Sequence, residues 1–132
     1  MTILITGATG AVGSALVQRL ANQNVDLNAL TRDPSKAKFP SGVTPVTGDM
    51  LDVESMRKAL AGVSTLFLLN AVSAQELTEA VLTLNLAREA GVARVVYFSV
   101  FNGDSFTNVP HFTSKHSVER TIAQLGLPAT VL

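Results

Sequence analysis

Apolar residues follow two different spacings along the chain. Ile3–Ile5 is apolar without alternation, and segment 94–99 is dense in β-branched and aromatic residues, as in parallel strands that are covered on both faces. Other stretches repeat apolar residues every three or four positions, as Val12, Leu16 and Leu20 do, which predicts a helix with one buried stripe. The chain is therefore expected to alternate between strands and helices.

Turn and capping residues set the expected limits of these elements. The expected strands are 3–5, 25–31, 44–47, 65–69, 94–99 and 129–132. The first helix is expected from Ala11 to about Ala21, and the stripes of the other three are Val53, Met56 and Leu60; Leu77, Val81 and Leu84; and Val118, Ile122 and Leu125. Asp52 is a candidate N-cap of the second helix, and the candidate helix stops are Gly62, Gly91 and Gly126.

This order of elements predicts an α/β fold. Strands that alternate with helices pair in parallel, and the helices then cover both faces of the sheet in three layers. Right-handed crossovers favour a doubly wound sheet of strand order 3-2-1-4-5, with strand six beyond five, which is the Rossmann arrangement. Residues 1–132 form one domain at this length. Because the chain stops inside an apolar strand, we expect a fragment whose substrate-facing part lies beyond Leu132.

A glycine-rich turn between the first strand and the first helix predicts a dinucleotide site. Gly7, Gly10 and Gly13 have the spacing G-x-x-G-x-x-G. The first allows a tight turn, the second lets the backbone approach a pyrophosphate, and the third lets the helix pack close to the sheet. Free N–H groups at the helix start would bind the phosphates. The predicted cofactor-binding residues of this turn are Gly7, Thr9, Gly10, Ala11, Val12 and Gly13.

The end of the second strand bears on which dinucleotide binds. An acidic residue there would hold the ribose hydroxyls of NAD, whereas a guanidinium would pair with the 2′-phosphate of NADP. The chain has Arg32 followed by Asp33, and Lys36 and Lys38 add positive charge nearby. This pattern favours NADP over NAD, with Asp33 as the ribose ligand in the alternative.

Other candidate binding residues follow strands three and four. Asp49 could accept a hydrogen bond from the adenine amino group, or it could be a loop or capping residue, and Met50 follows it. Asn70 and Ala71 end strand four at the carboxyl edge, where cofactor and substrate meet in open α/β sheets.

The candidate chemical groups come after strand five. Ser99 ends this strand and could hydrogen-bond a substrate carbonyl, and His111 and Lys115 are one helical turn apart on one face. His111 could donate a proton near neutral pH, and Lys115 could bind ribose hydroxyls. The alternative is a strand-end serine, a loop histidine after Pro110 and a surface lysine. His116 and Glu119 are expected to be ordinary helix surface.

The composition of the chain argues against several other kinds of function. The formal net charge is zero without a basic run, so no nucleic-acid partner is expected. No apolar stretch approaches the roughly 20 residues of a membrane span, so no membrane association is expected. The chain has no cysteine, which removes thiol catalysis and thiolate metal sites and is in keeping with the cytoplasm. No metal site is predicted.

The segments TGATGAVG, TRDPSKA, GD, VVYFS and VPHFTSKHSVE together resemble the NmrA-like family, an atypical branch of the short-chain dehydrogenase/reductase superfamily. The resemblance covers essentially the whole chain. It implies a Rossmann domain that binds NAD(P), usually NADP, followed by a smaller substrate-facing part. Typical reductases of the superfamily use Ser and then Tyr-x-x-x-Lys; Ser99 and Lys115 match the serine and the lysine, and His111 stands at the tyrosine position.

Two functions are compatible with this departure from the superfamily pattern. The first is an oxidoreductase that transfers hydride from NADPH to a quinone-like acceptor, since an electron-poor ring needs less help from a protein acid. The alternative is a non-catalytic regulator that senses NADP(H) and binds a protein partner. A homo-oligomer is a further expectation.

Overall fold

The computed structural model describes residues 1–132 and contains six strands and four helices. They are β1 (Thr2–Ile5), α1 (Ala11–Leu20), β2 (Asp26–Thr31), β3 (Val43–Thr47), α2 (Val53–Leu60), β4 (Thr65–Leu68), α3 (Glu76–Glu89), β5 (Arg94–Tyr97), α4 (Pro110–Leu125) and β6 (Ala129–Val131). The predicted strands agree with these bounds to within two residues. The apolar pattern marked only the second half of α4, which begins with a proline in its first turn.

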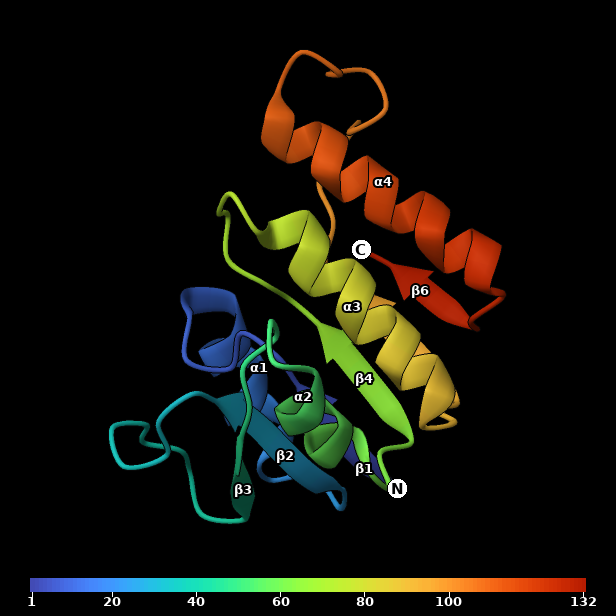
Figure 1. Cartoon of the computed structure of the whole chain (residues 1–132). Helices are drawn as coiled ribbons and strands as arrows, with labels where there is room; N and C mark the ends of the chain where they lie inside the picture. The colour runs from blue at the N-terminus through green and yellow to red at the C-terminus, as the bar shows by residue number, and fades with distance from the viewer.

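All six strands pair in parallel in the order β3-β2-β1-β4-β5-β6, which confirms the predicted doubly wound sheet. Helices α2, α3 and α4 lie on one face, and α1 lies on the other (Figure 1). None of the four helices combines the length and the apolar character that crossing a membrane requires.

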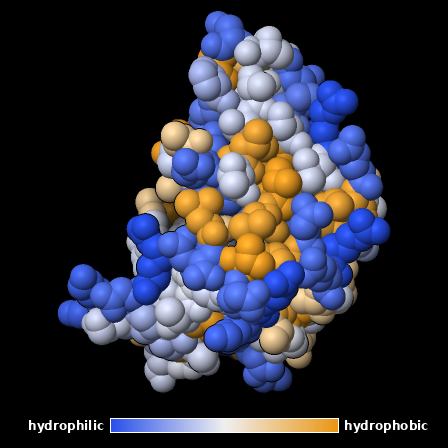
Figure 2. Space-filling model, in the orientation of Figure 1, coloured by the Kyte–Doolittle hydropathy of each residue, from blue (hydrophilic) through white to orange (hydrophobic).

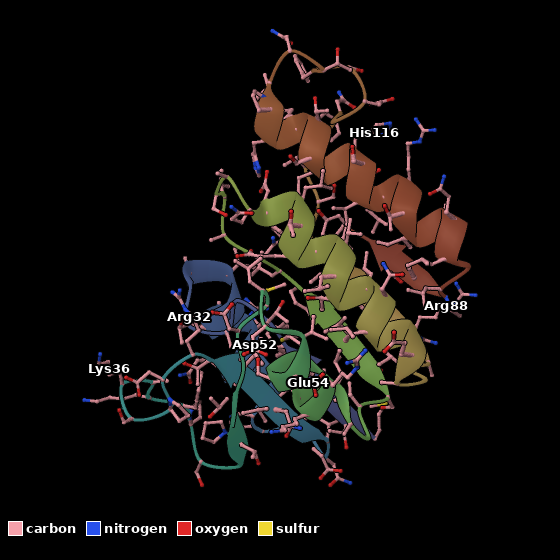
Figure 3. All side chains as sticks on the ribbon, viewed as in Figure 1. Arg32, Lys36, Asp52, Glu54, Arg88 and His116 are labelled. Carbon is pink, nitrogen blue, oxygen red and sulfur yellow. The ribbon has the colours of Figure 1, made fainter.

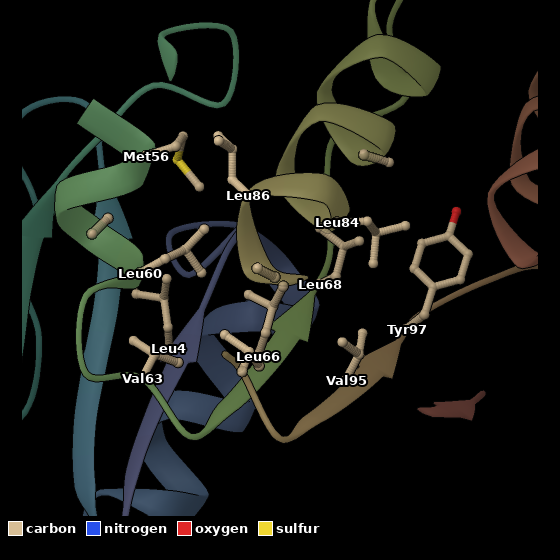
Figure 4. Close-up of a cluster of buried hydrophobic side chains, with 14 of the residues drawn as sticks. Leu4, Met56, Leu60, Val63, Leu66, Leu68, Leu84, Leu86, Val95 and Tyr97 are labelled. Atoms are coloured by element: carbon tan, nitrogen blue, oxygen red, sulfur yellow. The ribbon is translucent and has the colours of Figure 1, made fainter. Parts of the chain in front are cut away.

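The alternation of side chains along the strands divides the core between the two faces. Leu66 and Leu68 of β4 belong to the larger cluster, under α2, α3 and α4 (Figure 4). Phe67, between them in the sequence, belongs to the smaller cluster, beside α1. Tyr97 of β5 also points into the larger cluster. Asn70 and Ser99 follow Leu68 and Tyr97 by two positions, so their side chains are on the same face of the sheet, towards α3 and α4.

The predicted stripes of α2 and α4 are correct, and those of α1 and α3 are each wrong only at their first residue. Met56 of α2 and Val118 of α4 are buried as expected. In α1, however, Gly13 and Val17 are buried and Val12 is exposed, because the start of the helix approaches the loop at its glycine. The buried positions of α3 are Glu76, Ala80, Thr83, Leu84, Leu86 and Ala87.

In α3, Leu77 is exposed, in contrast to its predicted place in the buried stripe. This helix is apolar around much of its circumference, so the spacing of its leucines allowed more than one stripe. Figure 2 shows apolar side chains reaching the surface in the middle of the face that carries α2 and α3.

The turn from β1 to α1 is the tightest junction of the fold. A Cβ added to Gly13 would lie 2.0 Å from the carbonyl oxygen of Gly7, and Gly7 itself has a φ of +61°. The Thr6 hydroxyl donates to the Leu69 carbonyl at 2.7 Å and accepts from the Leu69 N–H at 2.8 Å. The glycine loop is therefore fixed both by its own helix and by the end of β4.

We predict that Gly13→Ala lowers the free energy of unfolding by about 1–3 kcal/mol, because the helix must move away from the Gly7 carbonyl. Gly10→Ala is the control, since its nearest neighbour would be 3.5 Å away, and it should lose at most about 1 kcal/mol as a poorer N-cap. Urea unfolding followed by circular dichroism measures both. Equal losses would contradict the packing role of Gly13.

Candidate functional site

The polar groups of the candidate site gather at one edge of the sheet. Because all strands are parallel, their carboxyl ends lie on the same side, together with the glycine loop and the first turns of α3 and α4 (Figure 1). This is the edge at which open α/β sheets bind their ligands.

The glycine loop presents unused hydrogen-bond donors. The N–H of Ser14 bonds the Gly10 carbonyl at 2.9 Å, whereas the N–H groups of Ala11, Val12 and Gly13 have no acceptor. Gly10 caps the helix without any side-chain hydrogen bond, and a Cβ added to it would meet only the Gly7 carbonyl oxygen, at 3.5 Å. An anion of the size of a pyrophosphate fits this cradle, because the donors are free and no side chain fills it.

The end of β2 presents a free guanidinium beside an engaged carboxylate. Asp33 accepts hydrogen bonds from the N–H of Ser35 at 3.0 Å and from its hydroxyl at 2.5 Å, and its other oxygen is 3.4 Å from Lys36. These bonds, with that of the Ser35 hydroxyl foremost, lower the pKa of Asp33. Arg32 is exposed and has no hydrogen bond or ion pair (Figure 3).

A cavity of about 230 Å³ opens between α1 and segment 36–40. Thr9 of the glycine loop lines it together with Lys36 and Lys38. Two of the predicted cofactor residues, Thr9 and Lys36, are thus brought to one concave surface.

The predicted residues after β3 and β4 differ in their surroundings. Asp49 is exposed and accepts a hydrogen bond from the N–H of Leu51 at 2.9 Å, so one of its oxygens shapes its own turn. Met50 packs against the larger core cluster, and Ala71 is exposed. Asn70 is buried and donates to the Glu76 carbonyl at 2.9 Å, and its own side-chain oxygen has no partner.

Ser99 is paired with a residue that was expected to be plain surface. It is buried, and its hydroxyl donates to the carboxylate of Glu119 in α4. The expectation for Glu119 is therefore wrong. Its signal was its spacing, four residues after Lys115, which places both side chains on one face of a helix. Because an ionised carboxylate only accepts, the single proton of Ser99 is engaged in this arrangement.

Lys115 is buried without a countercharge in contact. Its residue is only 4% exposed, its Nζ lies 3.4 Å from the Phe98 carbonyl oxygen and 5.2 Å from the centre of the Tyr97 ring, and no carboxylate is within 4.0 Å. Burial lowers the pKa of Lys115, and the more distant charge of Glu76 opposes this shift. Such an ammonium has donors to spare for a ligand.

Tyr97 is no substitute for the missing tyrosine of the superfamily pattern. Its ring lies fully buried in the larger core cluster, and its hydroxyl has no hydrogen-bond partner (Figure 4). Burial raises the pKa of Tyr97 far above its usual value, with smaller contributions from the charges of Glu76 and Glu119. A hydroxyl of this kind does not exchange protons with a ligand at the sheet edge.

His111 lies in the first turn of α4 and not in a loop. Its Nδ1 is 2.8 and 2.9 Å from the two carboxylate oxygens of Glu76, the first residue of α3. Glu76 is only 4% exposed. Glu76 was not predicted from the sequence, because nothing in the local pattern marks an acidic residue as buried. Its only signal is its place shortly after the carboxyl end of β4.

The strand order and the glycine loop define an NAD(P)-binding Rossmann fold. The chain belongs to the NmrA-like family, whose model matches residues 1–132.

Relatives of this chain include enzymes and an assembly factor. Quinone oxidoreductase 2 of Escherichia coli is 31% identical over 139 residues, which cover 98% of this chain and 47% of the relative. Photosystem II assembly factor Ycf39 of Cyanidium caldarium is 26% identical over 137 residues, with 96% and 44% covered. The triphenylmethane reductase of Citrobacter sp., solved with NADP(H), is 28% identical with a TM-score of 0.86, and 99% of this chain and 48% of that one are covered. The chain thus spans about half the length of these relatives.

We predict that Lys115→Met stabilises the fold by about 0.5–2 kcal/mol at pH 7, because it removes a buried charge that has no ion-pair partner. A lowered folded-state pKa means that the unfolded chain binds the proton more tightly. The gain should therefore shrink as the pH rises from the lowered pKa towards the usual 10.5.

Urea unfolding at several pH values measures this gain. The control is Lys58→Met at an exposed position of α2, which should leave the stability almost unchanged. A lower stability of Lys115→Met at pH 7 would show that interactions of the ammonium within the folded protein outweigh the cost of burying its charge.

Proposed function

We propose that this chain is the cofactor-binding part of an oxidoreductase that transfers hydride from NADPH to a quinone-like acceptor. The observation that carries the proposal is the buried Lys115, which has no carboxylate in contact and lies one helical turn from His111 at the ligand-binding edge. A buried, unpaired charge destabilises a fold, so its presence at this edge is best explained by a ligand.

The cofactor would lie along the carboxyl edge of the sheet. The N–H groups that follow Gly10 would bind the pyrophosphate, and Arg32 would pair with the 2′-phosphate, since Asp33 is engaged with Ser35. Asp49 would accept from the adenine amino group through its remaining oxygen, and Lys115 would bind the hydroxyls of the nicotinamide ribose.

The proposed chemistry needs one proton from the protein. NADPH supplies a hydride when bound. A quinone that takes up a hydride becomes a hydroquinone anion, which then takes one proton. His111 is proposed as the proton donor, because it stands where the superfamily has its tyrosine and its Nε2 is free of hydrogen bonds. Lys115 adds positive charge near the acceptor oxygen.

A non-catalytic NADP(H) sensor is the second candidate. Its support is the histidine at the tyrosine position together with the likeness to a photosystem II assembly factor. In that case the cofactor would change the affinity for a protein partner. That partner, a homo-oligomer and the cytoplasmic location all stay predictions.

We predict that the chain binds NADPH at least tenfold more tightly than NADH, a difference of about 1.4 kcal/mol, because Arg32 pairs with the 2′-phosphate. Arg32→Ala should remove most of this preference and leave NADH affinity unchanged. Arg88→Ala, at an exposed position near the end of α3, is the matched control (Figure 3). Calorimetric titration measures the affinities of all three proteins for both cofactors. If NADH binds as tightly as NADPH or more tightly, Asp33 and not Arg32 determines the preference, by binding the ribose hydroxyls.

We also predict that the full-length protein, of which this chain is the cofactor-binding part, oxidises NADPH in the presence of small quinones. Gly10→Ala should abolish this turnover by blocking the pyrophosphate while the fold persists, since its added Cβ contacts no protein atom closer than 3.5 Å. Loss of NADPH absorbance with a panel of quinones is the measurement. Tight NADPH binding without turnover on any quinone would reject the oxidoreductase and favour the sensor.

A further inference from the structure

We propose that Glu76 is a positioning residue for His111: it fixes the ring so that Nε2 is the atom that exchanges a proton with the bound acceptor. This inference rests on the proposed function. It adds to the site a residue that is no part of the Ser99, His111 and Lys115 arrangement.

The geometry of the pair determines which nitrogen carries hydrogen. Both carboxylate oxygens of Glu76 lie within 2.9 Å of Nδ1 of His111. An ionised carboxylate can only accept hydrogen bonds, so Nδ1 must be the donor. The neutral ring therefore has its hydrogen on Nδ1 and a lone pair on Nε2.

The structure gives Glu76 no other hydrogen-bond donor. Its side chain is held between the first turns of α3 and α4, and its two oxygens accept only from His111. Lys115 is near enough to feel its charge, but the two form no ion pair within 4.0 Å. The neighbouring acid Glu79 bonds the side chain of Asn70 at 3.2 Å instead.

The start of α3 is itself anchored. The Asn70 side chain donates to the backbone carbonyl of Glu76 at 2.9 Å, which ties this residue to the end of β4. A buried acceptor on an anchored backbone holds a ring in one orientation better than a mobile surface carboxylate does. His111 itself stays in contact with solvent, because its side chain is 24% exposed.

This arrangement completes the proton step of the proposed reaction. The acceptor takes a hydride from NADPH, and its anionic oxygen then forms a bond to the proton on Nε2 of the His111 imidazolium. The N–H bond at Nε2 breaks, and its electron pair remains on the ring as the lone pair of the neutral form. The Nδ1–H of His111 remains hydrogen-bonded to the Glu76 carboxylate throughout. Water returns a proton to Nε2 before the next turnover.

The test compares Glu76→Gln with Glu79→Gln. A glutamine has the same shape as glutamate but can also donate to Nδ1, which allows the opposite ring tautomer. Glu79→Gln changes the charge of the same helix by the same amount without touching His111. The chain has two histidines, so His116 is an internal reference in nitrogen NMR of the imidazole rings.

In the unsubstituted protein we expect neutral His111 to carry its hydrogen on Nδ1. Glu76→Gln should give a mixture of tautomers and lower kcat for quinone reduction at least about tenfold, with the NADPH affinity unchanged. Glu79→Gln should leave both the tautomer and kcat as they were.

The outcomes separate this inference from the proposed function. An unaltered His111 tautomer in Glu76→Gln, or an altered tautomer with unaltered kcat, would overturn the positioning role. If the unsubstituted protein reduces no quinone, the proposed function fails, and the tautomer measurement alone then decides whether Glu76 fixes the His111 ring.

Discussion

The parallel pairing of all six strands is the constraint on which the rest of the structure depends. Each strand must therefore be joined to the next by a crossover, which contains a helix at every connection except that from β2 to β3, and every carboxyl end lies at one edge. Groups that are far apart in the sequence meet there for this reason alone. Glu76 and His111, separated by 35 positions, are joined because α3 and α4 begin on the same side of the sheet.

This edge also concentrates the polar groups that the fold tolerates poorly. Lys115 is buried without a carboxylate in contact, and the side-chain oxygen of Asn70 has no partner. Away from the edge, the buried side chains are aliphatic or aromatic with few exceptions, among them Thr83 of α3, whose hydroxyl also has no partner. The uneven distribution indicates that stability comes from the two faces of the sheet, while its edge is shaped for a ligand.

Much of the fold could be predicted from the sequence, because strands buried on both faces leave unbroken apolar runs and the loop needs glycines at fixed spacing. The buried positions at the starts of α1 and α3 could not, since a small or a charged residue is buried there while a larger apolar residue, such as Leu77, is exposed. The candidate site was predicted only in part. Ser99 and Lys115 lie where strand order places them, whereas the burial of Glu76 and the bond from Ser99 to Glu119 arise from contacts between elements.

The three glycines of the loop are under different kinds of restraint. Gly7 and Gly13 are held by the protein itself, one by its positive φ and both by backbone atoms that leave no room for a side chain. A Cβ at Gly10 would make only an ordinary van der Waals contact with the protein, and the backbone of Gly10 is in an extended conformation that any residue can adopt. A descendant of this chain that gave up its nucleotide would keep the first and the third glycine for the sake of folding and would be free to lose the second. Substitutions at that single position would then indicate that the ligand is no longer bound, although the fold is unchanged.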